Sequence, residues 1–229
     1  MTVYDWPAVL RPNHSTIPVL ERNNASAGVS VTGMERLLAT DAGRWRYGFR
    51  VPVRNREQVL SWRALMALTE GRTFMVRVPV CDSLNDPAYA IRSAISRANP
   101  SGIPHSDSGM HDDGAGYALS LVNGTVAATA NAGATSISVT MPTGLAPQPG
   151  HFFSDGDRLY TVKTATLTSG TTYALTFLPR LRVQIPVGHD VSFDRLFCIM
   201  RIASEDMLQV EQELRRFSEL SLSFTEALV

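Results

Sequence analysis

The clearest pattern along the chain is a strict alternation of apolar and polar residues between positions 44 and 53. An apolar residue at every second position is the period of a strand with one buried face. We therefore predict a strand over 44–53 whose large side chains belong to a core. They are more often core than a platform for a ligand, and the same holds for Trp62 further on. The apolar positions are Trp45, Tyr47, Phe49, Val51 and Val53.

A helical pattern follows this strand directly. Asn55 is suited to cap a helix, with Gln58 three residues on completing the capping pair. Apolar residues then recur at helical spacing until Gly71, which predicts a helix over about 55–70. A second alternating segment, 74–80, predicts another strand. A strand, an amphipathic helix and a strand form a layered unit in which the helix covers part of a sheet. The apolar helix positions are Val59, Trp62, Leu65, Met66 and Leu68.

The pattern changes after the second strand. Residues 82–116 are rich in Asn, Asp, Pro, Ser and Gly, and only 89–98 suggest a short helix. Connections this long are functional, are ordered by a partner, or lead into an inserted domain. Several short strands follow at even spacing, which predicts a small β-barrel of about 75 residues. The strands expected in it are 136–140, 158–163, 173–177 and 191–193.

The end of the chain returns to larger apolar residues. Segments 196–202 and 220–224 are predicted strands, whereas 207–217 fits both a strand and a helix, and we favour a strand. The fold class is therefore mainly β: a β-sandwich with one packed helix, interrupted by a small inserted β-barrel. We expect a core domain made of residues 1–114 and 193–229, and an inserted domain over 115–192.

Composition and charge narrow the function classes. Twenty-one basic residues balance twenty-one acidic ones, so the chain lacks the positive field of a dedicated nucleic-acid binder. No apolar run approaches the roughly 18 residues of a membrane span, and we find no signal peptide. Lys163 is the only lysine; the excess of arginine reflects either a GC-rich genome or carboxylate pairing at interfaces. Cys81 and Cys198 stand in apolar runs and are expected to be buried.

One segment is rich in potential metal ligands, the loop from His105 to Asp113, which also contains Asp107, His111 and Asp112. Imidazole and carboxylate groups both bind borderline metals, but the spacing matches neither a zinc helix nor a calcium loop. A solvated turn is the alternative, and we expect no metal there. The chain has no nucleophile elbow, no phosphate-binding loop and no cofactor motif. We therefore expect no catalytic residues, no cofactor and no enzymatic activity.

Several segments together resemble the distal tail protein, a minor tail and baseplate component of long-tailed, non-contractile phages (siphoviruses). The likeness runs from about Thr32 to the C-terminus, and its motifs mark structural positions rather than a reaction. They are Thr32–Glu35, Gly43–Arg46, Ser61–Leu65, Asn131–Val139, Gly156–Tyr160, Leu178–Arg182, Met200–Ile202 and Ser221–Ala227.

The resemblance implies a structural virion protein with a core related to the tail-tube subunit. Six copies would form a ring at the tail tip, joining the tail tube to the baseplate hub and letting DNA pass during ejection. The protein would be made in the host cytoplasm, without a membrane anchor. Its partners would be further copies of itself, the tube protein and the hub protein, with DNA only in transit.

Ring assembly suggests roles for charged residues. Each copy in a closed ring contacts the next through two different faces, and strand arginines could pair with carboxylates of the neighbour. The inter-subunit candidates are Arg44, Arg46, Arg50 and Arg77. A channel wall should not retain phosphate, so acidic residues facing it are expected; otherwise they form a solvated face. The channel candidates are Glu205, Asp206, Glu211 and Glu213.

Three alternatives remain open at the level of sequence. The chain could be a carbohydrate- or receptor-binding tail module, because small barrels often present loops to sugars. It could instead be another hub or completion protein of the same tail, or a wall-degrading enzyme. A sugar site needs an exposed aromatic ring. The inserted segment offers Phe152, Phe153, Tyr160, Tyr173 and Phe177.

Overall fold

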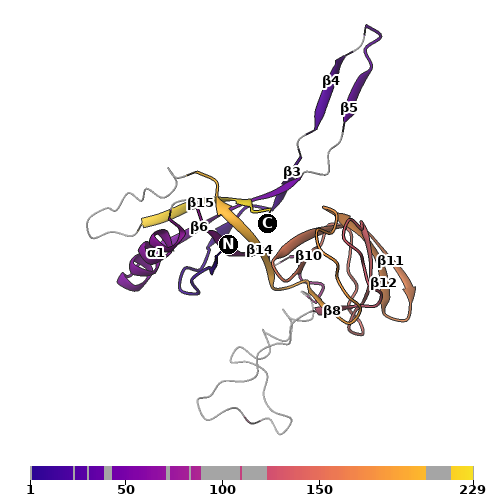
Figure 1. Ribbon diagram of the computed structural model, residues 1–229. Helices are drawn as coiled ribbons and strands as arrows, with labels where there is room; N and C mark the ends of the chain where they lie inside the picture. Colours follow the sequence, from indigo (N-terminus) through magenta and orange to yellow (C-terminus); the bar gives the residue numbers. More distant parts are fainter. Residues whose placement is uncertain are drawn as a thin grey trace. The chain divides into compact units, whose positions relative to one another are not determined.

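The computed structural model describes residues 2–22, 24–29, 31–38, 43–70, 73–82, 84–88, 109, 123–204 and 218–228. The chain divides into two compact units (Figure 1). Unit 1 consists of Met1–Cys81, Gly156–Leu159 and Leu196–Val229. Unit 2 consists of Asp82–Asp155 and Tyr160–Arg195. The mainly-β fold class predicted from the sequence is confirmed, with a large sheet, one packed helix and a closed barrel.

Unit 1 is built on a seven-stranded sheet in the order β1-β7-β14-β15-β6-β2, with β3 also pairing with β6. The β1–β7 pair is parallel, and the other pairs are antiparallel. Strands from the end of the chain, β14 and β15, lie between β7 and β6 from its first third, so both ends of the chain form one sheet. The strands are β1 (Val3–Asp5), β2 (His14–Ser15), β3 (Val19–Glu21), β6 (Arg44–Val53), β7 (Met75–Val80), β14 (Leu196–Ile202) and β15 (Ser218–Glu226).

The alternation in β6 produces the buried face that the sequence predicts. Its five apolar residues are almost fully buried, and Trp45 is 1% exposed. Trp6, which follows β1, packs edge-on against Phe49 and Phe224 and also contacts Trp62 of the helix. Aromatic contacts of this kind add roughly 0.5–1.5 kcal/mol each to the burial of their area. The aromatic residues of this segment are therefore core.

The helix α1 (Arg56–Thr69) begins where the sequence predicts. The Asn55 side chain accepts the N–H of Gln58 at 2.9 Å, and the Gln58 side chain accepts the N–H of Arg54 at 2.7 Å. Such an N-cap contributes about 1 kcal/mol. The helix also ends within the predicted range of about 55–70, and Glu70 after it adopts the left-handed conformation with φ 44°. Gly71, which the sequence suggested as the end of the helix, lies outside the described residues. Leu68 was expected on the buried face and is exposed.

A separate two-stranded ribbon follows β3 in the chain. Strands β4 (Ala25–Val29) and β5 (Glu35–Leu38) pair antiparallel, with a bulge between Ser26 and Val29. Gly33 in the turn has φ 79°, a conformation that favours glycine. We call residues 25–38 the arm. Its strands β4 and β5 are labelled in Figure 1, and neither was predicted from the sequence pattern.

Unit 2 is a closed barrel with the strand order β10-β11-β12-β9-β8-β13. Its interior is filled by apolar side chains, among which Phe153, Phe177 and Phe193 are fully buried. The predicted barrel strands are present, but β8 and β10 were not predicted. The strands are β8 (Asn123–Val126), β9 (Ser136–Thr140), β10 (Phe152–Asp155), β11 (Arg158–Ser169), β12 (Thr172–Leu178) and β13 (Asp190–Ser192).

The two units divide the chain at positions other than the expected 114/115 and 192/193. Residues after Cys81 already belong to unit 2, since Asn85 is buried there and donates to the carbonyls of Phe152 and Phe193 at 2.8 and 2.6 Å. Residues 156–159 belong to unit 1, where the Asp157 carbonyl accepts the N–H of Ile199. The segments 89–98 and 207–217 lie outside the described residues.

Candidate functional site

Three of the four arginines predicted at a subunit interface lie on the solvent side of β6. Arg44, Arg46 and Arg50 are exposed, and they alternate with the buried aromatic residues of the same strand. Gly48 takes the outward position between Arg46 and Arg50. Strand β15 pairs with β6 so that Ser221 lies opposite Arg50 and Ser223 opposite Gly48. The outward face of β6 therefore carries guanidinium groups separated by small residues.

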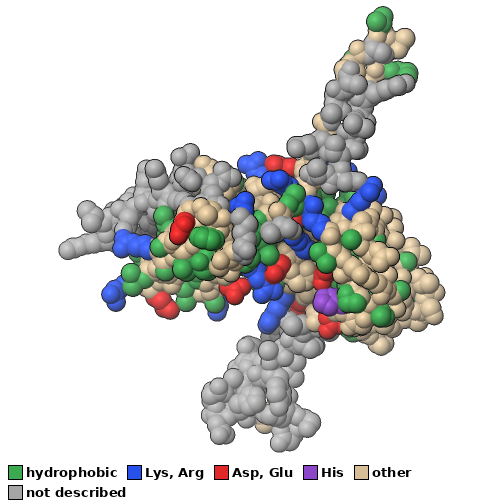
Figure 2. All heavy atoms as spheres, viewed as in Figure 1, with side chains coloured by type: hydrophobic (Ala, Val, Ile, Leu, Met, Phe, Trp, Pro, Cys, Tyr) green, Lys and Arg blue, Asp and Glu red, His purple; other side chains and the backbone are tan. Residues whose placement is uncertain are grey.

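Arg46 and Arg50 form only weak ion pairs within the chain. Arg46 pairs with Glu21 at 3.0 Å, and Arg50 lies 3.9 Å from Glu219. All four side chains are about half exposed, and exposed pairs contribute only about 0–1 kcal/mol. Figure 2 shows the mixed character of the visible surface, where Lys and Arg side chains lie beside Asp and Glu side chains. Arg46 and Arg50 can therefore exchange their carboxylate partners at a small energetic cost.

Arg77 differs from the other three predicted interface arginines. Its Nε lies 2.5 Å from Asp157 Oδ1, and its guanidinium carbon lies 4.1 Å from the centre of the Phe197 ring. Such a cation–π contact contributes about 0.5–1 kcal/mol at an exposed site. Arg77 therefore makes its main contacts within unit 1.

A groove of about 690 Å³ lies over the middle of β6, and we call it the β6 groove. Thr16 and Ile17, which connect β2 to β3, line one part of it, and the Thr16 hydroxyl accepts the Gly48 N–H at 2.9 Å. A Cβ on Gly48 would lie 3.0 Å from the Leu222 carbonyl oxygen. A larger residue at this position would therefore crowd the backbone of β15, and glycine leaves the groove unfilled there. Its outward lining consists of His14, Thr16, Ile17, Val19, Glu21, Arg46, Arg50, Ser221 and Ser223.

The chemistry of the β6 groove suits a peptide that carries both apolar and acidic groups. The two guanidinium groups present planar pairs of donors that match a carboxylate, and the two serine hydroxyls add further hydrogen-bonding groups. Ile17 and Val19 are 72% and 57% exposed and give the groove an apolar rim. Its volume lies within the range of about 300–1,000 Å³ typical of ligand pockets.

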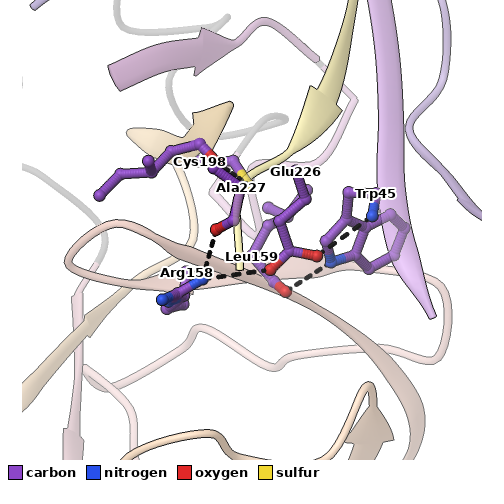
Figure 3. A network of polar contacts seen from close by, with 7 residues as sticks. Trp45, Arg158, Leu159, Cys198, Glu226 and Ala227 are labelled. Atoms are coloured by element: carbon purple, nitrogen blue, oxygen red, sulfur yellow. Dashed lines mark hydrogen bonds and ion pairs between the residues drawn. The ribbon is translucent and has the colours of Figure 1, made fainter. Parts of the chain in front are cut away.

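A buried polar network lies elsewhere in unit 1 (Figure 3). Glu226 of β15 is 3% exposed, and its carboxylate accepts the backbone N–H of Trp45 at 3.1 Å. Arg158 approaches the same carboxylate at 3.5 Å and donates to the Ala227 carbonyl at 3.0 Å. The Trp45 indole donates to the Leu159 carbonyl at 2.7 Å. The network ties residues 158–159 to the two central strands β6 and β15, as the close view shows.

The two cysteines lie in different environments. Cys198 is buried beside this network, and burial raises the pKa of its thiol, as does the negative charge of Glu226. A thiol held in its neutral form is a poor nucleophile. Cys81 is exposed, so the prediction that it is buried is wrong. Its backbone N–H donates to the Tyr47 hydroxyl at 3.0 Å, and burial of that phenol raises the pKa of Tyr47 to about 12.

Other predicted site residues lie outside the described part of the chain. This holds for the channel candidates Glu205, Asp206, Glu211 and Glu213, and for the ligand-rich loop from His105 to Asp113 apart from Gly109. Within the described ranges, no group of three or more His, Cys, Asp or Glu side chains is placed to hold a metal ion. No helix in those ranges has the length and apolar character needed to cross a membrane.

The aromatic residues considered for a sugar site are mostly interior. Phe152, Phe153, Tyr160 and Phe177 are buried, and only Tyr173 is partly exposed. Phe153 stacks on Tyr160 with their ring centres 5.1 Å apart. Phe153, Tyr160 and Phe177 belong to the barrel core and Phe152 is buried, so these four rings do not form an exposed platform for a sugar.

Sequence reasoning found the outward arginines but missed the groove between them. The glycine inside an otherwise alternating strand was the available signal, because a strand glycine often marks close approach of another chain segment. Glu226 and Arg158 were missed because nothing in their separation of 68 positions signals a contact. No protein-family model and no curated protein matches this sequence.

Proposed function

We propose that this chain is a structural protein of a phage tail tip, whose copies form a ring that joins the tail tube to the baseplate hub and lets DNA pass. The proposal rests on the resemblance of its sequence motifs to distal tail proteins. The observation in the structure that supports it best is the outward face of β6, with exchangeable arginines around a groove.

A ring subunit must keep its shape while two of its faces contact neighbours. The seven-stranded sheet suits this role, because its central strands come from both ends of the chain and are tied together by the Glu226 network. The same sheet offers one exposed polar face to another copy.

The exposed ion pairs of Arg46 and Arg50 support a contact between copies. Replacing an intrachain carboxylate by one from a neighbour changes little in desolvation, because both arginines remain near the surface. Charge complementarity at such a contact fixes orientation more than it adds affinity. A head-to-tail contact that uses different faces on the two copies closes into a ring when its rotation permits.

The charge balance agrees with passage of DNA. A chain of zero formal net charge attracts phosphate weakly. The proposed channel wall consists of the acidic residues Glu205, Asp206, Glu211 and Glu213, which lie outside the described residues.

Native mass spectrometry over a range of concentrations tests this proposal. We expect a discrete closed species, and six copies of the 25.0 kDa chain is the number that the resemblance favours. The variant R46E/R50E should shift the population towards monomers, whereas substitution of exposed barrel residues such as Lys163 should not. A monomer at all concentrations, unaffected by either change, would contradict the proposal.

A further inference from the structure

Exposed apolar residues gather at the turn of the arm. Val31 is fully exposed, and Val29 and Met34 are 68% and 66% exposed. A two-stranded ribbon without further packing is only marginally stable in water, and an apolar tip adds nothing to its solubility. This combination is typical of a segment that becomes buried against another surface.

The β6 groove has the complementary properties. Its rim carries Ile17 and Val19, and its outward side chains include Arg46 and Arg50. The arm tip carries Val31 and Met34 followed directly by Glu35. Apolar residues can therefore meet the apolar rim while the carboxylate of Glu35 meets a guanidinium group. Arg50 is the better partner, because its intrachain carboxylate is 3.9 Å away and that of Arg46 is 3.0 Å away.

The dimensions of the two surfaces also agree. Arg46 and Arg50 are four positions apart on a strand, which places their Cα atoms about 13 Å from each other at roughly 3.3 Å per residue. A two-stranded ribbon has its strands about 5 Å apart, so a hairpin turn with its side chains fits between the two arginines. Gly48, Ser221 and Ser223 leave this space open.

The groove lies next to the root of its own arm. Glu21 lines the groove and ends β3, while the arm begins only four residues later at Ala25. An extended segment from Ala25 to Val31 spans about 20 Å, which carries the tip away from the residues at its root. A ribbon of this length reaches a neighbouring molecule more readily than it folds back on the strand from which it starts.

We propose that the arm tip, Val31–Glu35, inserts into the β6 groove of a second copy of this chain. The contact joins two different faces, so each copy donates one tip and accepts one. It rests on the proposed ring and names the surfaces that hold the ring together.

Disulfide trapping between variants that each carry one introduced cysteine tests this pairing, because the remaining native cysteine, Cys198, is buried. In a Cys81→Ser background, which keeps the backbone N–H bonded to Tyr47, the variants V31C and S221C are mixed and oxidised. We expect a crosslinked dimer that contains one copy of each variant. The matched control replaces Ser221→Cys by Ser169→Cys, an exposed serine of the barrel, and should give at least tenfold less dimer.

Charge reversal provides the second measurement. E35R and R50E should each raise the concentration for half-association by about threefold or more, and E35R/R50E should return it to within about twofold of the original value. V31D should weaken association, while V187D, which changes an exposed barrel valine, should not.

The outcomes separate this inference from the proposed ring. A ring without the V31C–S221C crosslink, or with that crosslink formed inside one chain carrying both cysteines, overturns the arm contact and leaves the ring. A crosslinked chain of copies that never closes supports the arm contact and contradicts the ring. A monomer that gives no crosslink contradicts both.

Discussion

Replacing Arg158 by methionine removes the positive charge beside the buried carboxylate of Glu226 while keeping an aliphatic side chain. The Glu226 side chain is 1% exposed and that of Arg158 is 15% exposed, so water cannot readily replace the lost cation. Removing one partner of a buried pair typically costs about 3–5 kcal/mol, because the other charge stays buried without compensation. That is a large part of the roughly 5–15 kcal/mol that stabilises a domain.

The partner variant Glu226→Gln should cost less. Its amide oxygen can still accept the Trp45 N–H, and the Arg158 side chain retains its hydrogen bond to the Ala227 carbonyl. We expect about 1–2 kcal/mol for this change. The double variant R158M/E226Q should be less destabilised than the sum of the two, with a coupling of roughly 1–3 kcal/mol.

Urea unfolding followed by tryptophan fluorescence measures these energies in unit 1. The three tryptophans, Trp6, Trp45 and Trp62, all belong to unit 1, so this signal does not follow the barrel directly. Arg50→Met is the matched control, since Arg50 and Glu219 are both exposed and the change should cost under about 1 kcal/mol. A coupling below about 0.5 kcal/mol, or equal effects of R158M and R50M, would refute the reasoning.

Four further predictions concern single positions. Asn85→Leu removes a buried amide that holds two barrel carbonyls, so circular dichroism during urea unfolding should show a loss of about 2–4 kcal/mol. Burial raises the pKa of Tyr47 to about 12 in the folded protein, whereas an exposed tyrosine titrates near 10.0. The unfolded chain therefore loses this proton first, so the free energy of unfolding is unaffected below pH 10 and falls by up to about 3 kcal/mol as the pH rises to 12; Tyr47→Phe should remove that part of the alkaline slope. A thiol reagent should modify Cys81 in the folded protein and Cys198 only after unfolding, and two equally fast thiols would contradict this. Glu70→Gly should stabilise unit 1 by about 1 kcal/mol, since φ is 44° there, and thermal melting checks the sign.

The elements predicted correctly are those whose residues repeat with a clear period. Strand β6 matches the predicted range 44–53, because each of its inward positions is large and apolar. The helix start was predictable because Asn55 and Gln58 act locally. Strands β2 and β3 were missed because two or three residues are too few to show a period.

Other elements could not be predicted because their buried residues do not alternate with exposed ones. Strand β10 has three consecutive buried residues, Phe152, Phe153 and Ser154, so no period of two is visible. The early start of unit 2 was missed because a single side chain, Asn85, ties that segment to the barrel. Hydrogen bonds between positions 67 and 108 residues apart leave no mark in one sequence.

In the candidate site, too, the local features could be predicted and the contacts between distant residues could not. Exposed arginines could be predicted from their places in an alternating strand, and three of the four lie outward on β6. The β6 groove depends on where β2 leaves and β3 rejoins the sheet, which a sequence pattern does not encode. The buried partnership of Glu226 with Arg158 likewise follows from the topology.

Electron cryomicroscopy of the assembled protein tests the central claim of a ring most directly. We predict a closed ring in which density from each copy continues onto the outward face of β6 in the next. Separate copies, or a ring whose contacts leave that face of β6 in solvent, would contradict the account.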